Sequence, residues 1–106
     1  MIYWLLVFSE PTELSEFDFN EWYDKQHIPD LLKIPGVIAA RRLKASEAQF
    51  DVKDDLPGRY LAVYEIKTDS IESVFSEMKA RVDTADMVMS EAINLDSIKT
   101  MVFRIL

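Results

Sequence analysis

The segments of this chain that read as β-strands carry apolar side chains on both faces, and no other feature restricts the possible fold as strongly. Over residues 2–8 the even positions are Ile, Trp, Leu and Phe, and the odd positions are Tyr, Leu and Val. Successive side chains of a strand point to opposite faces, so both faces of this strand are apolar. Residues 60–66 and 101–106 largely repeat the pattern. A sheet built from these strands needs cover on both sides.

The remaining elements are too few to provide that cover. Strands are predicted over residues 3–8, 37–44, 59–67 and 98–106, and helices over 16–27 and 71–82, in the order βαββαβ. Two helices cover only one face of a four-stranded sheet. The other face would remain an apolar patch larger than a monomer usually exposes. We therefore expect one α+β domain over residues 1–106 that forms a homodimer by burying its second sheet face against another copy.

Three further segments give local predictions. Ser15 and Asp18 form a capping-box pattern for the first helix, and Ser70 is placed to cap the second. Pro29 predicts that the first helix ends or kinks just past His27, with a short segment over 30–34 before Pro35 and Gly36. Residues 84–97 are compatible with either a helical turn or a packed loop. The acidic residues of the 47–57 connection are expected to form a solvated loop rather than a metal site: Asp51, Asp54 and Asp55.

Composition excludes several classes of function. The chain has 19 acidic and 12 basic residues, a net charge of −7, which repels phosphate backbones and anionic lipid. We expect no nucleic-acid and no membrane partner. The absence of cysteine excludes disulfides and thiolate ligands and fits a cytoplasmic protein. One histidine and two glycines leave no multi-histidine metal site and no phosphate-binding loop, so we expect neither a metal nor a cofactor.

A more specific motif lies in the first helix. Residues 19–32 read FNEWYDKQHIPDLL, Pro35-Gly36 follows, and positions 41 and 42 are both arginine. This stretch resembles the first-helix signature of EthD-like proteins, which belong to the dimeric α/β-barrel, ferredoxin-like superfamily. The resemblance implies a four-stranded antiparallel sheet of order 4-1-3-2 with two helices on one face, and dimer sheets packed face to face. It also implies a small pocket in each protomer between the sheet and the helices.

His27 is the foremost candidate for chemistry. Its side chain is the only one in the chain with an ordinary pKa, about 6.5, near neutrality. Asp24 lies three residues before it and Asp30 three after, so either carboxylate can orient the ring, and Tyr23 is adjacent on the helix. We expect His27 to act as an acid or base, with Asp30 and Tyr23 as catalytic partners. The alternative is a histidine that only caps the end of the helix.

Other aromatic and polar side chains are candidates for ligand binding. An aromatic ring can stack on a planar ligand, a phenol can donate a hydrogen bond to an oxyanion, and an arginine can hold a carboxylate or phenolate. The alternatives are core packing for the aromatic residues and a surface ion pair for the arginine; the two arginines of the second strand point to opposite faces. The candidates are Trp22, Tyr60, Tyr64, Arg41 and Asn20.

These residues suggest a protein that binds a small, largely apolar molecule of aromatic or polyketide-like character. Relatives of EthD-like proteins include cyclases, dehydratases, isomerases and cofactor-free monooxygenases. Proton transfer without a cofactor (isomerisation, cyclisation or dehydration) fits the groups present here best. A cofactor-free monooxygenase, a non-catalytic binding or accessory protein of a catabolic pathway, and an assembly protein with a vestigial pocket are the alternatives.

Overall fold

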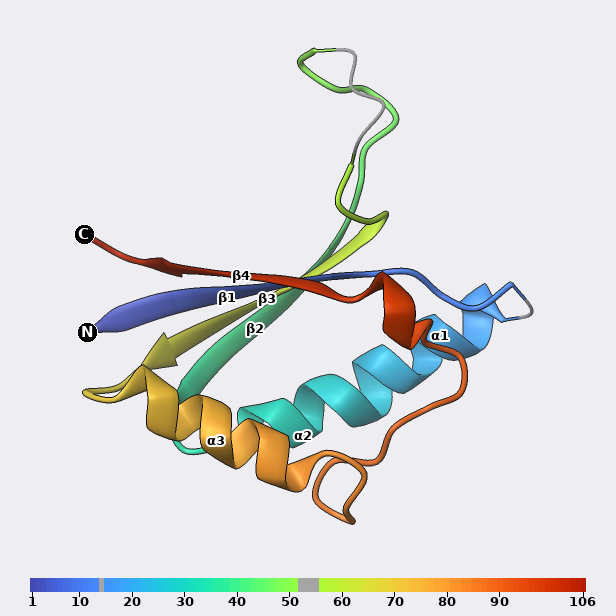
Figure 1. The fold of residues 1–106 in the computed structure, drawn as a ribbon. Helices are drawn as coiled ribbons and strands as arrows, with labels where there is room; N and C mark the ends of the chain where they lie inside the picture. The colour runs from blue at the N-terminus through green and yellow to red at the C-terminus, as the bar shows by residue number, and fades with distance from the viewer. Residues whose placement is uncertain (14, 52–55) are drawn as a thin grey trace.

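A four-stranded antiparallel sheet forms the centre of the protein. The computed structural model describes residues 1–13, 15–51 and 56–106. The strand order is β2-β3-β1-β4, with β1 pairing antiparallel to both β3 and β4 (Figure 1). This confirms the expected ferredoxin-like order, and the predicted strands agree with the observed ones within two residues at each end. The strands are β1 Ile2–Ser9, β2 Val37–Lys44, β3 Tyr60–Lys67 and β4 Lys99–Arg104.

The helices lie together on one face of this sheet (Figure 1). Helix α1 spans Glu16–Trp22 and α3 spans Ile71–Arg81. Both predicted caps are present, since the Ser15 side chain accepts from the N–H of Asp18 and the Ser70 side chain from the N–H of Ser73. Such caps satisfy backbone donors that an isolated helix start leaves free. The two helix starts are therefore set by local sequence.

Of the two outcomes predicted just past His27, an end or a kink of the first helix, the end is wrong. The chain continues through a π-helical turn, η1 Tyr23–His27, into α2 Ile28–Leu32. In an α-helix the ring of Pro29 would clash with the carbonyl four residues earlier. The wider turn, in which the Ile28 N–H donates to the Tyr23 carbonyl, places Pro29 in the first turn of α2, where proline is tolerated. The helical run ends before Gly36, whose φ of +99° suits glycine.

The segment left open over residues 84–97 is mainly a packed loop. It contains one short 3₁₀ turn, η2 Leu95–Ser97. Met87 and Ile93 are buried in it, so the loop completes the core beside the helices. Of the predicted solvated acidic residues, Asp51 is exposed, whereas Asp54 and Asp55 lie outside the described residues. The core consists of Leu5, Phe19, Tyr23, Leu31, Ile34, Val37, Tyr60, Ala62, Tyr64, Ile66, Val74, Met87, Ala92 and Ile93.

In the described part of the chain, the other face of the sheet carries no helix, and it exposes large apolar side chains. Trp4 pairs with Phe103 across β1 and β4, so their side chains share this face. All six residues of β4 are exposed. The alternation of apolar side chains on both faces, read from the sequence, is thus present in the folded chain. The most exposed members of this open face, each between 44 % and 56 % accessible, are Trp4, Leu43, Met101, Phe103 and Ile105.

Candidate functional site

A cavity of about 180 Å³ lies between the helix-covered face of the sheet and the helices. Its walls come from β1, β3, η1, α2, the end of α3 and the loop that follows. Most of the lining is aliphatic or thioether, and the polar members are one histidine, one tyrosine and one lysine. The lining residues are Leu5, Val7, His27, Leu31, Tyr64, Met78, Lys79, Val82, Met87 and Met89. The structure therefore contains a cavity at the expected place, between the sheet and the helices.

His27 presents a neutral imidazole to this cavity. Its ring stacks on Trp22 at a centroid distance of 4.5 Å and meets the edge of Tyr23 at 5.1 Å. Burial lowers its pKa to about 4, and the nearby charge of Asp30 opposes the shift only in part. Its Nδ1 atom is buried and has no hydrogen-bond partner among the described residues. A buried polar atom without a partner is costly, and a bound ligand or water would satisfy it.

Tyr64 supplies the second unsatisfied polar atom. Its side chain is 1 % exposed, and its hydroxyl has no partner with good hydrogen-bond geometry among the described residues. Burial raises its pKa well above the ordinary value, and the neighbouring Tyr23 raises it further. Tyr64 therefore stays protonated at neutral pH and can donate a hydrogen bond. Of the two tyrosines of β3 that are candidates for a hydrogen bond to an oxyanion, only Tyr64 lines the cavity.

Tyr23 is a neighbour of Tyr64 but is not among the residues that line the cavity. It is 2 % exposed, and burial raises its pKa. The hydroxyls of Tyr64 and Ser9, followed by the charge of Arg42, act in the opposite direction. The two phenols are close enough for each to affect the other's pKa, although the Tyr64 hydroxyl lacks a well-placed partner. Tyr23 can therefore influence the cavity only through its neighbour.

Neither predicted carboxylate hydrogen-bonds to His27. Asp30 is buried, but its Oδ2 accepts from Gln26 Nε2 at 2.7 Å and from the Val88 N–H at 3.4 Å. It therefore ties the helix to the loop after α3 and acts on His27 only through its charge. Asp24 instead pairs with Arg42, Nη1 to Oδ1, at 2.9 Å. The expectation that a carboxylate orients the ring is not met by this geometry.

Trp22 orients His27 without lining the cavity. Its indole N–H donates to the carbonyl of Val88 at 2.9 Å, which fixes the ring on which the imidazole stacks. Of the two arginines, Arg42 lies on the helix side, 4.5 Å above the centre of the Tyr23 ring. Arg41 lies on the open face of the sheet and lines a separate hollow of about 440 Å³ with Trp4 and Glu65. Arg41 is therefore not part of the His27 site.

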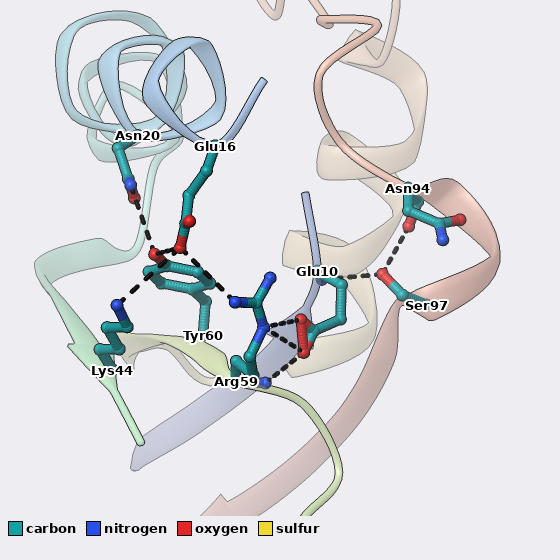
Figure 2. Close-up of polar contacts among 8 residues, drawn as sticks. All are labelled: Glu10, Glu16, Asn20, Lys44, Arg59, Tyr60, Asn94 and Ser97. Carbon is teal, nitrogen blue, oxygen red and sulfur yellow. Dashed lines mark hydrogen bonds and ion pairs between the residues drawn. The ribbon is translucent and has the colours of Figure 1, made fainter. Parts of the chain in front are cut away.

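Tyr60 and Asn20 belong to a different polar cluster (Figure 2). The Tyr60 hydroxyl donates to Glu16 and accepts from Asn20 Nδ2, and Asn20 Oδ1 also accepts from Arg42. The hydrogen bond from Tyr60, with help from the charges of Lys44 and Arg59, lowers the pKa of Glu16. This cluster holds the start of α1 against the sheet. It does not line the cavity, so the structure separates Tyr60 and Asn20 from His27.

Several cavity residues were not singled out from the sequence. Met78 lies in the helix predicted over residues 71–82, and Met87 and Met89 lie in the segment 84–97, for which the sequence left a helical turn or a packed loop open. Nothing in the sequence marked Lys79 as a cavity residue, because a single lysine on a helix is usually solvated. The described residues contain no group of three or more His, Cys, Asp and Glu side chains placed to hold a metal ion. No described helix is long and apolar enough to cross a membrane.

Comparison with known proteins gives a relationship at the level of the fold. No family model matches the sequence, and no curated protein matches it significantly. Among solved structures, the chain is similar to an EthD family protein from Bacillus halodurans C-125, with a TM-score of 0.55 and 13 % identity. The match covers 100 % of this chain and 99 % of that one. The resemblance noted in the first helix is thus matched by an EthD family structure with the same fold throughout.

Proposed function

We propose that this protein binds a small, largely apolar oxygen-containing molecule between His27 and Tyr64 and catalyses a proton transfer on it. The observation that carries the proposal is a pair of buried polar atoms, His27 Nδ1 and the Tyr64 hydroxyl, that have no hydrogen-bond partner among the described residues. Both belong to residues that line the same apolar cavity. Elsewhere in a protein interior such atoms are nearly always paired. A ligand oxygen beside them would supply the missing hydrogen-bond partner.

The cavity sets the size and polarity of the ligand. An apolar cavity of about 150 Å³ is large enough to accept benzene, and the cavity here measures about 180 Å³. Its aliphatic and thioether walls favour a single ring or a short branched chain. Methionine adapts to irregular shapes and contacts aromatic rings favourably, and Met78, Met87 and Met89 all line the space. A monocyclic phenol, enone or ketone fits these walls.

The two polar groups are suited to opposite roles. Neutral His27 can take a proton from the carbon next to a carbonyl group, while Tyr64 donates a hydrogen bond to the oxygen on which negative charge develops. The imidazolium then returns the proton to another carbon of the conjugated enolate, so the step consumes no co-reactant. A pKa of about 4 makes the free imidazole a weak base, but an enolate formed beside it favours the charged ring.

A binding protein without turnover is the second candidate, and one observation favours it. The imidazole has no carboxylate hydrogen bond to hold its tautomer, because Asp30 is engaged by Gln26 and Val88. Enzymes that use a histidine base commonly orient it through the second ring nitrogen. Under this candidate His27 and Tyr64 only recognise the ligand oxygen, and the protein sequesters or delivers the molecule as an accessory component.

Substitution of the two cavity residues tests catalysis. In D₂O, we expect the wild-type protein to accelerate hydrogen–deuterium exchange at the enolisable carbons of 2-cyclohexenone, followed by NMR. His27→Gln should lower the rate by about 10²-fold or more, and Tyr64→Phe by a similar factor through loss of one oxyanion donor. Tyr60→Phe is the matched control, because Tyr60 lies on the same face of β3 and its hydroxyl is bound to Glu16.

The same samples separate the two candidates. His27 is the only histidine, so its ring signals report binding directly. If 4-methylphenol or 2-cyclohexenone shifts the ring signals but the wild-type protein gives no exchange above buffer, the protein binds the ligand without catalysing the proton transfer. Ring signals that no ligand moves, at concentrations up to solubility, would remove the cavity as a functional site.

We further propose that the open face of the sheet is covered by a second copy of the chain. Its apolar side chains are exposed on β1, β2 and β4, and burial of apolar surface contributes roughly 25 cal/mol per Å². About 1,000 Å² would yield on the order of 25 kcal/mol before the cost of association. A self-complementary apolar face is typical of a two-fold dimer.

A further inference from the structure

We infer that the ligand of the His27 cavity is an amphipathic organic acid, whose carboxylate is held at the cavity mouth by Lys79. This inference rests on the proposed binding function and specifies its substrate class. The ligand would place an oxygen function between His27 and Tyr64, an apolar body among the methionine and aliphatic walls, and an anionic group at the opposite end. Lys79 is thereby a specificity-determining residue.

The distribution of polar groups along the cavity carries this inference. Two of the lining residues carry neutral polar groups, the His27 imidazole and the protonated Tyr64 phenol, which can recognise an uncharged oxygen. Lys79 is the one residue with a formal charge among those described as lining the cavity, and it is exposed. Its aliphatic stem can continue the apolar wall while its ammonium group stays in water. The cavity wall thus includes the side chain of one cationic residue.

Lys79 is also free to meet an anion. Arg81, two residues further along α3, is engaged by Glu77 at 2.7 Å. No ion pair joins Lys79 to another residue of the described ranges. The chain as a whole carries a charge of −7, which disfavours anions in general. A cation at this mouth therefore changes selectivity more than the same cation would on a basic protein.

Two ligands of nearly equal shape test the role of the charge. Tyrosol and 4-hydroxyphenylacetate share the phenol and the two-carbon arm, and differ in ending in an alcohol or a carboxylate. Binding is measured by titration of the His27 ring signals in 20 mM salt, where screening is weak. We expect wild-type protein to bind the acid about three- to fivefold more tightly than the alcohol, the range expected for one exposed ion pair.

Substitution of the lysine should remove this preference. Lys79→Met keeps an apolar stem, so the alcohol should bind within twofold of wild type while the acid loses its advantage. Lys33→Met removes the same charge from an exposed lysine that does not line the cavity and should leave the preference intact. Circular dichroism confirms that both variants fold.

The outcomes are distinguishable. If both ligands move the His27 signals with equal affinity, or if Lys33→Met reduces the preference as much as Lys79→Met, the amphipathic-acid inference is overturned and the cavity function stands. If neither ligand moves the signals of wild-type protein, the proposed function fails and the substrate class fails with it. Loss of the preference in Lys79→Met alone supports the inference.

Discussion

Acidification from pH 7 to pH 4 should lower the free energy of unfolding by roughly 3 kcal/mol through His27 alone. The ring has a pKa of about 4 in the folded protein and about 6.5 in the unfolded chain. The unfolded state therefore binds more protons between these two values, and stability rises with pH across that window. Above pH 6.5 the ring is neutral in both states and carries no penalty. Each pH unit below costs about 1.36 kcal/mol until the folded ring titrates.

Urea unfolding at pH 7 and pH 4, in wild-type protein and in His27→Gln, measures this contribution. Glutamine does not titrate, so the variant retains only the pH dependence of the other groups. We expect the loss of stability on acidification to be smaller in the variant by roughly 3 kcal/mol. Equal losses in both proteins would mean that His27 is not buried as a neutral ring. The comparison holds even if the variant is less stable at both pH values, because only the difference between the pH values is used.

The parts of the fold that the sequence predicted are those set by local chemistry. The caps at Ser15 and Ser70 need only a side-chain oxygen and a backbone N–H three residues away, and both form. Alternation along β1 and β3 places the same side chains on one face whatever they pack against. The π turn at residues 23–27 was not predicted. Pro29 indicated an end or a kink of the first helix, and one wider turn that keeps the helical run continuous was not considered.

The residues of the candidate site could not be identified from local sequence patterns alone, because they depend on contacts with residues that lie far away along the chain. Tyr60 and Tyr64 share a face of β3, and the sequence could not decide between them. The decision depends on which hydroxyl finds a partner across the sheet–helix boundary: Tyr60 meets Glu16, while Tyr64 is left without one. The same holds for Asp30, which sequence spacing placed near His27. Its oxygen is taken by Gln26 and by a backbone N–H 58 residues away.

Arg41 and Arg42 show what the alternation of side chains along a strand can predict and what it cannot. It correctly placed the two residues on opposite faces of β2, yet the choice of Arg41 for the ligand site followed no physical criterion. Arg42 faces the helices, where Asp24 and Asn20 hold its guanidinium group over the Tyr23 ring. Arg41 lines the open face. Its role therefore depends on what covers that face.

The protein should have twice the mass of one chain by light scattering at micromolar concentration, and Phe103→Glu should reduce it to the monomer mass. Phe103 pairs with Trp4 on the open face and is 56 % exposed. In the dimer that we propose this side chain is buried, and a buried, unpaired carboxylate costs several kcal/mol. Because 1.4 kcal/mol corresponds to a tenfold change in affinity, we expect the dissociation constant to rise by about 10²-fold or more.

Val102→Glu is the matched control for this experiment. Val102 is the preceding residue of β4 and is 44 % exposed, but it pairs with Leu5 and so points to the opposite face of the sheet. If the open face alone forms the interface, this carboxylate stays in water and the variant remains a dimer. A monomeric wild-type protein, or equal dissociation of both variants, would show that the second face is not covered as proposed. Dissociation of the Phe103 variant alone would assign the interface to the face that carries Arg41.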